Sequence, residues 1–301
     1  MSESLRPARF TQAYCDSLPP FDRGLSWLSW AYNEEGLIAE YLKRANELLQ
    51  RTVEDYEIVV VDDGSTDRTP AILKDLAQEI PSLRVVTNET NRNVGYSCRR
   101  AIMAAGKEYL MWQTVDWSYD ISMLRVFLEF LKSHDVVAGV RRAPVQQANR
   151  VHRVALGLLR LLGVKHITRR SDTIPKALVS VTNYLLIRAL FRVPLSDFQN
   201  LCIYPTALIQ PMEKEADSSF LNPEMLMKSY WSGHSIVEVP ISFIPRQAGQ
   251  AKGTQFRAIR ASVRDIFRLW VKWNLLKRGL SRRRGTVRRL VRTEWPSDAI
   301  S

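Results

Sequence analysis

The sequence predicts an α/β protein with a mostly parallel central sheet, and three observations carry this prediction. Short apolar runs alternate with helix-like segments between residues 25 and 133. One run, residues 58–61, is continuously apolar rather than alternating, which is typical of a strand covered on both faces. The chain has 301 residues, of which 46% are hydrophobic and 25% are charged, so it can bury a sizeable core. We therefore expect helices on both faces of the sheet.

The apolar runs are expected to form the strands, and the segments between them the helices. We expect strands at residues 25–30, 58–61, 83–86, 109–112 and 136–140. We expect helices at residues 34–51, 70–79, 94–105 and 121–132. Thr69 followed by Pro70 predicts the N-cap and first turn of the second helix.

The positive charge is concentrated near the C-terminus. The chain has 43 Lys and Arg against 31 Asp and Glu, and residues 246–292 hold 15 of these basic residues but a single acid, Asp265. Such a segment favours an anionic partner, which could be nucleic acid, phospholipid headgroups or a phosphorylated ligand. The alternative is that the last stretch, from residue 281 on, is a solvated basic tail.

Several classes of protein are disfavoured. Cys15, Cys98 and Cys202 are far apart and odd in number, which argues against a disulfide framework and a thiolate zinc site. No apolar run reaches the roughly 18 residues that cross a bilayer, and the N-terminus lacks the pattern of a signal peptide. Neither the dinucleotide-binding nor the P-loop glycine motif is present. We therefore expect a cytoplasmic protein without a membrane span.

Polar residues follow four of the expected strands, where ligands bind in parallel α/β sheets. Carboxylates at that edge can accept hydrogen bonds from a nucleotide base and ribose, or hold a hard divalent cation beside a diphosphate. The alternative for Asp-Asp-Gly-Ser is ordinary turn chemistry with a helix cap. The polar segments are residues 32–35, 62–67 and 91–95, followed by Asp116 and Asp120.

These motifs resemble family 2 glycosyltransferases of the GT-A fold. The resemblance is carried by Tyr-Asn-Glu-Glu at 32–35, Val-Val-Val-Asp-Asp-Gly-Ser-Thr-Asp at 59–67 and Asn-x-Asn-x-Gly at 91–95. Gly-Val-Arg at 139–141, Asp-Phe-Gln-Asn at 197–200 and Glu-Val-Pro-Ile at 238–241 resemble the polyprenyl-phosphate (dolichol-phosphate) mannosyl- and glucosyltransferase branch. The resemblance implies a GT-A domain over residues 25–255, with a helical insertion at 143–178. An N-terminal arm (1–24), an amphipathic basic helix (256–280) and a basic tail (281–301) would flank it.

The resemblance also implies roles for residues at the donor site. Tyr32 and Glu34 would line the nucleotide pocket, Asp62 would contact the base, and Arg92 would lie beside the nucleotide. The family's Asp-x-Asp metal motif here reads Thr114-Val115-Asp116, so Asp116 is the expected ligand of Mg²⁺ or Mn²⁺, completed by donor phosphates and water. Asp120 would contribute only if its loop folded back.

The chemistry that the resemblance implies is inverting transfer from a nucleotide sugar. A lipid-phosphate acceptor is already anionic, so the main requirement is to stabilise charge on the departing nucleoside diphosphate. Arg141, Arg246 and Lys252 match positions expected to meet phosphate, with Arg246 assisting catalysis beside Asp116. Lys176 and Ser180 have the spacing of a further pair that binds the acceptor phosphate.

A sugar-hydroxyl acceptor would instead require a carboxylate base. Asp197 and Glu224 are the candidates, and a structural hydrogen bond is the alternative role for each.

Residues 255–278 are expected to form one helix with an apolar strip, which includes Trp270 and Trp273, beside a strip of five cations. Such a helix is typical of attachment to anionic lipid. Residues 149–162 form a second, shorter candidate. The alternative is that both helices pack on the catalytic domain. We expect peripheral attachment to the inner face of the cell membrane, either directly or through a membrane-bound partner.

Three functions follow from these features. The first is an enzyme that transfers a sugar to a polyprenyl phosphate or another membrane glycan. The second is a non-catalytic or regulatory relative that binds a nucleotide sugar, because Thr114 replaces a carboxylate. The third, nucleic-acid binding through the basic tail, has the least support, because charge alone provides only nonspecific phosphate affinity.

Overall fold

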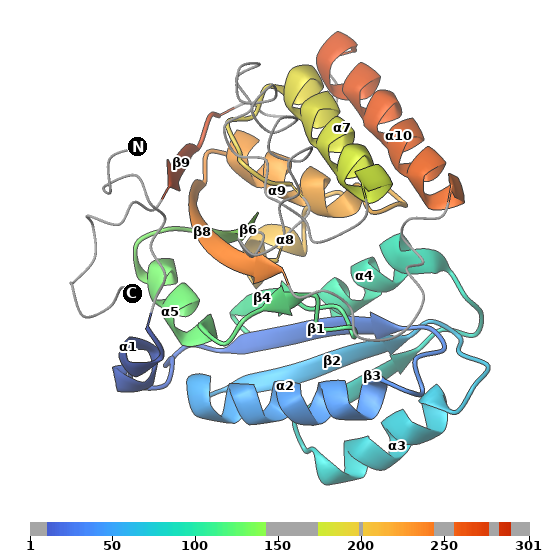
Figure 1. Ribbon diagram of the computed structural model, residues 1–301, viewed down its shortest axis with the longest axis vertical. Helices are drawn as coiled ribbons and strands as arrows, with labels where there is room; N and C mark the ends of the chain where they lie inside the picture. The colour runs from blue at the N-terminus through green and yellow to red at the C-terminus, as the bar shows by residue number, and fades with distance from the viewer. Residues whose placement is uncertain (1–10, 143–173, 199–200, 244–255, 277–282, 290–301) are drawn as a thin grey trace.

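The computed structural model describes residues 11–142, 174–198, 201–243, 256–276 and 283–289. These residues form one mixed nine-stranded sheet with helices on both faces (Figure 1). The strand order is β3-β2-β1-β4-β7-β6-β8-β5, and β9 pairs with β8. The strands are β1 Leu25–Ala31, β2 Tyr56–Asp62, β3 Leu83–Thr87, β4 Tyr109–Trp112, β5 Tyr119–Asp120, β6 Val136–Arg142, β7 Cys202–Pro205, β8 Ser235–Phe243 and β9 Thr286–Arg289.

The helices divide between the two faces of the sheet. α2 and α3 cover one face, and α4 covers the other (Figure 1). In the second half of the chain, α7 and α10 lie side by side. The helices are α1 Gln12–Ser17, α2 Ile38–Thr52, α3 Thr69–Glu79, α4 Asn93–Ala104, α5 Leu124–Glu129, α7 Ile174–Phe191, α8 Thr206–Ile209, α9 Leu221–Trp231 and α10 Phe256–Trp270. α5 continues as a 3₁₀ turn over Phe130–Lys132, and α10 as a π-helical turn over Val271–Leu275.

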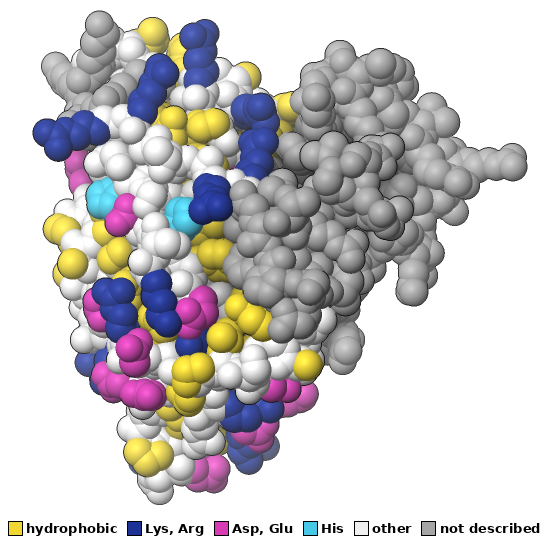
Figure 2. All heavy atoms as spheres, turned by 90° about the vertical axis from the view of Figure 1, so that its left-hand side faces the viewer, with side chains coloured by type: hydrophobic (Ala, Val, Ile, Leu, Met, Phe, Trp, Pro, Cys, Tyr) yellow, Lys and Arg dark blue, Asp and Glu magenta, His cyan; other side chains and the backbone are white. Residues whose placement is uncertain are grey.

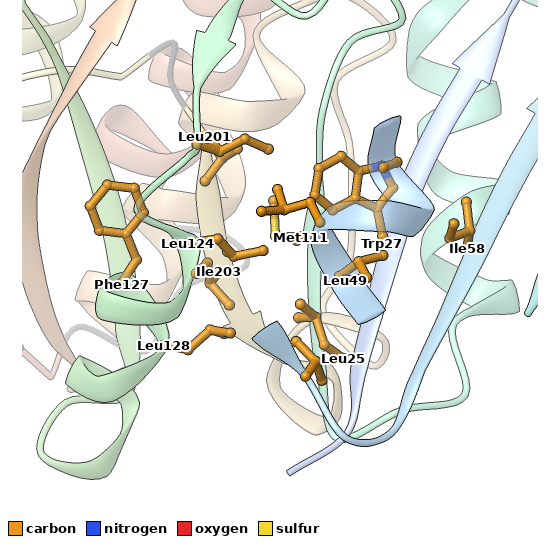
Figure 3. Close-up of a cluster of buried hydrophobic side chains, with 14 of the residues drawn as sticks. Leu25, Trp27, Leu49, Ile58, Met111, Leu124, Phe127, Leu128, Leu201 and Ile203 are labelled. Atoms are coloured by element: carbon orange, nitrogen blue, oxygen red, sulfur yellow. The ribbon is translucent and has the colours of Figure 1, made fainter. Parts of the chain in front are cut away.

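The predicted α/β fold is confirmed, and β1 to β4 pair in parallel. Residues 58–61 of β2 are fully buried, as the continuously apolar run predicts. The buried side chains form two clusters, one on each face of the sheet. Figure 3 shows one of them, in which Leu25 and Trp27 of β1 lie near Leu49 of α2 and Met111 of β4.

The helix predicted from residue 121 begins at Leu124, and two other helix starts differ from the prediction for local reasons. The first helix begins at Ile38 rather than residue 34, because the preceding residues form a loop in which Asn33 has φ of 52°. Thr69 is the first residue of α3 rather than its N-cap. Its backbone N–H donates to Asp67 Oδ1 at 2.9 Å, while its hydroxyl accepts from the Glu34 amide at 2.9 Å. Arg68 is therefore the N-cap residue and makes no side-chain capping bond, while Asp67 before it accepts from the first amide of the helix.

The second half of the sheet contains pairings that the alternating pattern did not predict. β7 runs antiparallel between β4 and β6. β9, which falls within the expected basic tail, pairs in parallel with β8. Arg289 of β9 donates from Nε to the buried Glu238 carboxylate at 3.1 Å. This part of the tail is therefore an ordered strand.

α10 packs on the domain through the side that includes its tryptophans. Trp273 is buried, and its indole N–H donates to Glu215 Oε1 at 3.0 Å. Trp270 is partly buried and donates to the Leu190 carbonyl of α7 at 3.1 Å. The expectation that these two tryptophans face lipid is therefore wrong. Among the described residues, none of the helices is both long enough and apolar enough for a membrane span.

Buried acids tie α9 and α10 to the loop between α8 and α9. Glu224 of α9 is fully buried and accepts from the backbone amides of Glu215 at 2.9 Å and Ala216 at 2.8 Å. Asp265 of α10 accepts from the amides of Asp217 and Ser218, both at 3.1 Å. These bonds hold the loop against the N-terminal turn of α4. The approach is close there, since a Cβ atom on Gly95 would lie 2.6 Å from the Asp217 carbonyl carbon.

That close approach predicts the effect of adding one methyl group. Overpacking in Gly95→Ala should lower the free energy of unfolding by about 1–3 kcal/mol. The higher helix propensity of alanine should offset up to about 1 kcal/mol of this loss. Gly36→Ala is the matched control, because no atom lies within 4 Å of a Cβ there. Urea unfolding measures both, and equal stabilities of the two variants would contradict the close contact.

Candidate nucleotide-sugar site

The carboxyl ends of the strands meet at one edge of the sheet. β3, β2, β1 and β4 are adjacent and parallel, so the loops that follow them leave from the same edge. β7 is antiparallel to β4 and β6, so the segment before β7 and the end of β6 lie at this edge too. β5 pairs Tyr119 with Phe243 at the end of β8. The loop that carries Asp116 therefore crosses this edge from β4 to β8.

The loop after β1 is joined to the loop after β2 by hydrogen bonds. The Asn33 amide donates to the Ser65 hydroxyl at 3.0 Å, and the Thr66 amide donates back to Asn33 Oδ1 at 2.8 Å. Asp67 accepts from the Glu35 amide at 3.2 Å. Burial would raise the pKa of Asp67, but its hydrogen bonds outweigh burial and lower it, so the carboxylate stays ionised. These contacts hold the segment of Tyr32 and Glu34 beside the β2 loop.

Asp62, the last residue of β2, and Asp63, which follows it, have different roles. Asp62 is 1% exposed and its Oδ1 accepts from the Ser65 amide at 3.1 Å, which shapes the turn. Asp63 Oδ1 accepts from Asn88 Nδ2 at 2.7 Å and from the Arg92 amide at 2.9 Å. Asp63 thus positions the start of the Arg92 segment. Sequence reasoning assigned a role to the first acid of the pair only.

The β2 and β3 loops are packed backbone against backbone. Gly64 has φ of 69°, and a Cβ atom there would lie 2.6 Å from the Thr90 carbonyl carbon. Only glycine combines this conformation with this approach at little cost. Beyond the contact, the Arg92 guanidinium lies over the Tyr96 ring at 4.9 Å. Arg92 is exposed at the same edge as Asp62. The resemblance to family 2 glycosyltransferases implies that the nucleotide binds at this edge.

Two hydroxyl groups surround Asp116 in the loop after β4. Thr114 Oγ1 and Ser118 Oγ donate to Asp116 Oδ1 at 2.5 and 2.6 Å. Among the described residues, no three His, Cys, Asp or Glu side chains gather into a metal-binding group. One carboxylate with neighbouring hydroxyls fits Mg²⁺ or Mn²⁺ when substrate phosphates and water supply the other oxygens. Asp120 instead accepts from the Ser122 amide at 3.1 Å and hydroxyl at 2.8 Å, just before α5.

An aromatic cluster fixes the conformation of this loop. Trp117, with φ of 50°, is buried against Trp27 and Tyr41 at ring-centroid distances of 5.7 and 5.8 Å. The Arg44 guanidinium lies 4.2 Å from the Trp117 ring centre. The Gln113 carbonyl accepts from the Tyr41 hydroxyl at 3.0 Å. The residue after Asp116 is thus held in a left-handed conformation by packing that the motif itself does not reveal.

The two candidate bases lie in different places. Asp197 is buried in the segment that precedes β7. The neighbouring Ser196 donates from its amide at 2.5 Å and from its hydroxyl at 2.7 Å to Glu238. Glu224 instead accepts from two backbone amides and from Lys228 at 2.7 Å. This geometry gives Glu224 a structural role, and a catalytic role for either acid stays a prediction.

The predicted phosphate-binding residues are placed only in part. Arg141 is in β6, near the strand end that meets the other loops. Lys176 and Ser180 are in α7. The side chains of these three residues lie outside the described part of the chain. Arg246 and Lys252 lie wholly outside it, as do residues 149–162.

The Tyr41 hydroxyl offers a test of the aromatic cluster. It accepts from Trp27 Nε1 at 2.8 Å while donating to Gln113, and burial raises the pKa of Tyr41. Tyr41→Phe should lower the free energy of unfolding by about 1–3 kcal/mol, because it leaves a buried N–H and a carbonyl without this partner. Urea unfolding should show a lower midpoint with an unchanged slope, and an unchanged midpoint would contradict the assigned contacts.

The chain is similar to proteins of known class. Residues 26–193 match the model of Glycosyl transferase family 2. The chain is 24% identical over 264 residues to glycosyltransferase AglD of Haloferax volcanii, an alignment that covers 85% of this chain and 38% of that protein. It is 47% identical over 73 residues to the undecaprenyl-phosphate 4-deoxy-4-formamido-L-arabinose transferase of Edwardsiella ictaluri, covering 24% of this chain and 22% of that protein. The chain thus spans well under half the length of these relatives.

Solved structures share the fold. Glucosyl-3-phosphoglycerate synthase from Mycobacterium tuberculosis, solved with Mn²⁺, UDP and glucosyl-3-phosphoglycerate, superposes with a TM-score of 0.53 at 15% identity, covering 89% of this chain and 85% of that one. TarS from S. aureus, solved with UDP-GlcNAc, has a TM-score of 0.51 at 17% identity, covering 83% and 67%. Both are GT-A glycosyltransferases. This chain has the GT-A fold and belongs to glycosyl transferase family 2.

Proposed function

We propose that the chain transfers a sugar from a nucleotide-sugar donor to a polyprenyl phosphate or another membrane-associated glycan acceptor, with inversion and with help from a divalent cation. The observation that carries this proposal is that the loops with Asp62, Arg92 and Asp116 leave from the same edge of the sheet. This edge is where ligands of open α/β sheets bind. Membership of glycosyl transferase family 2 supports transferase chemistry there.

The donor half of the site would use the loops after β1, β2 and β3. Asp62 would accept a hydrogen bond from an N–H of the base, with Tyr32 and Glu34 lining the pocket. Arg92, exposed beside this edge, would lie near the anionic diphosphate. Asp63 would act through Arg92, because it holds the Arg92 amide at 2.9 Å. The UDP and UDP-GlcNAc complexes of the structural neighbours support a nucleotide ligand for the fold.

Asp116 would hold Mg²⁺ or Mn²⁺ together with the donor diphosphate, with the hydroxyls of Thr114 and Ser118 alongside. A bound cation would supply neutralisation of the charge that develops on the departing nucleoside diphosphate. The conformation of Trp117 keeps the carboxylate in place before the donor arrives, which reduces the reorganisation that catalysis would otherwise require. The structural neighbour that was solved with both Mn²⁺ and UDP supports this cofactor.

In the transfer step, an acceptor oxygen would attack the anomeric carbon while the bond from that carbon to the donor phosphate oxygen breaks. The electron pair of that bond leaves with the nucleoside diphosphate, and the configuration inverts. A polyprenyl-phosphate oxygen is already anionic and needs no base. A reaction without a base agrees with the structural role of Glu224, whose oxygens accept from backbone amides and from Lys228. The undecaprenyl-phosphate transferase among the relatives supports this acceptor.

The remaining expected roles belong to the acceptor side of this proposal. Arg141, Arg246 and Lys252 would meet phosphate groups, and Lys176 with Ser180 would bind the acceptor phosphate. Asp197 is the candidate base if the acceptor is a sugar hydroxyl. We infer that the enzyme works at the inner face of the cell membrane, where a lipid-linked acceptor would be presented.

The second candidate is a non-catalytic protein that binds a nucleotide sugar. Thr114 favours it, because a hydroxyl contributes much less than a carboxylate to cation binding. A thermal-shift screen of nucleotide sugars with Mg²⁺ or Mn²⁺ tests donor binding, which both candidates require. Slow hydrolysis of the stabilising donor then separates them: the enzyme releases free sugar, whereas the non-catalytic protein does not.

Asp62→Asn tests the base contact without removing the turn. Asparagine keeps the oxygen that accepts from the Ser65 amide but loses the charge. The donor and its free nucleoside diphosphate should both bind about tenfold to a hundredfold more weakly, because a charge-assisted hydrogen bond is lost. Asp75→Asn on the exposed face of α3 is the control. Calorimetric affinities equal to the wild type for both ligands would refute the assignment.

Asp116 and Thr114 test the metal. Asp116→Asn should abolish Mn²⁺-dependent turnover, and calorimetry should detect no Mn²⁺ binding in the presence of nucleoside diphosphate. Thr114→Asp should tighten that binding, because it adds a second carboxylate. Wild-type activity that persists in excess EDTA would remove the cation from the mechanism.

A further inference from the structure

α10 exposes a line of apolar side chains on the side away from its buried face. We call Val263, Phe267, Val271 and Leu275 the α10 stripe. They recur every fourth residue, and their exposed fractions are 38%, 47%, 39% and 61%. Leu276, 56% exposed, extends it. In Figure 1, α10 forms the outer edge of the molecule beside α7, at the end opposite α3.

This concentration distinguishes the stripe from ordinary surface hydrophobics. Seven large hydrophobic side chains are exposed in the described part of the chain. Four of them belong to α10 and the turn that continues it, and a fifth, Leu276, follows directly. The other two, Val94 and Met103, are on α4. Single exposed hydrophobics are normal, whereas a contiguous line marks a contact surface.

Cationic side chains flank the stripe. Arg260 is exposed, and the side chains of Arg264 and Arg268 are 67% and 51% exposed. The acid within α10, Asp265, is fully buried and accepts from backbone amides of the neighbouring loop. Arg268 also donates to the Glu215 carbonyl at 2.6 Å. Arg264 lies 3.7 Å from Asp265 Oδ1 but keeps most of its side chain exposed, so Arg260 and Arg264 are the cations best placed to meet an external partner.

The charge of this surface selects its occupant. A second copy would place the same cationic surface against itself across a two-fold axis, and like charges would repel. Residues 149–162 of this chain carry Arg150, Arg153 and Arg160, so that segment is disfavoured for the same reason. An anionic bilayer complements both the apolar stripe and the flanking arginines, because its apolar chains lie beneath negatively charged phosphate groups.

We propose that the α10 stripe inserts into an anionic phospholipid bilayer, with Arg260 and Arg264 at the headgroup phosphates. Trp270 and Trp273 stay on the protein side of the helix, hydrogen-bonded to Leu190 and Glu215. The inference extends the proposed function, because it brings the enzyme to the surface that would hold its acceptor. Its physical basis does not depend on the identity of the donor.

Co-sedimentation with vesicles of phosphatidylglycerol and phosphatidylcholine in equal parts tests the surface. Val263→Ser with Phe267→Ser should weaken partitioning about tenfold or more at any salt concentration, because apolar insertion is not screened. Arg260→Gln with Arg264→Gln should weaken it about fivefold per cation at low salt and less at high salt. The matched controls, Met103→Ser and Lys43→Gln with Lys74→Gln, alter exposed residues elsewhere and should bind like the wild type.

A fluorescent label reports insertion directly. The three native cysteines are buried, so Phe267→Cys can be labelled selectively with a polarity-sensitive dye. Its emission should shift to shorter wavelength on addition of the anionic vesicles, and the same dye on Met103→Cys should not respond. Thermal unfolding and donor binding of each variant confirm that the fold and the nucleotide site are intact.

Three results would overturn the inference. The first is a folded wild type that does not sediment with the anionic vesicles at low salt. The second is binding that both pairs of α10 substitutions leave unchanged. The third is a wild-type dimer that Val263→Ser with Phe267→Ser converts to a monomer, which would assign the stripe to a second copy. Loss of vesicle binding with retained donor binding separates this inference from a failure of the proposed function.

Discussion

The parallel arrangement of β3, β2, β1 and β4 is the constraint on which the rest of the site depends. It brings the ends of four strands to one edge, so the loops that carry Asp62, Arg92 and Asp116 leave from that edge although these residues are far apart in sequence. Short polar contacts then fix the loops relative to one another. Gly64 permits the closest of these approaches, because no other residue allows the β2 loop to lie directly against Thr90.

Buried acids hold the second half of the fold together, as Asp63 does for the loops at the sheet edge. Glu238 of β8 joins three segments, because it accepts from Ser196 of the segment after α7 and from Arg289 of β9. Burial raises the pKa of Glu238, while hydrogen bonds from Ser196 and the charge of Arg289 favour its ionised form. Glu224 and Asp265 likewise accept from loop amides. Burial alone therefore does not identify a catalytic carboxylate.

Much of the first half of the fold could be predicted from sequence, because local patterns determine it. The continuously apolar run at 58–61 identified a central strand, and Asp-Asp-Gly-Ser identified the turn after it. Long-range contacts were not accessible in this way. The pairing of β9 with β8 is accompanied by a bond from Arg289 to the buried Glu238, about 50 residues away in sequence. Residues 286–289 have no hydrophobic periodicity that would predict this pairing.

In the candidate site too, some residues could be predicted from local motifs and others could not. Motifs pointed to Asp62 and Asp116 but not to Asp63, whose role depends on Asn88 and Arg92 of the next loop. The conformation of Trp117 depends on Trp27 and Tyr41, which precede it by many residues. For α10, periodicity predicted one apolar strip beside a cationic one, but it could not decide which apolar residues face the core. Packing on α7 and Glu215 turns Trp270 and Trp273 inward and leaves Val263 and Phe267 exposed.

The most direct measurement of the central claim is sugar transfer itself. The wild-type chain is incubated with a panel of nucleotide sugars, undecaprenyl phosphate and Mn²⁺, and the lipid fraction is analysed by mass spectrometry. The account predicts a lipid phosphate that carries one added sugar, together with an equal amount of free nucleoside diphosphate. A donor that binds tightly but is neither transferred nor hydrolysed under any of these conditions would contradict it.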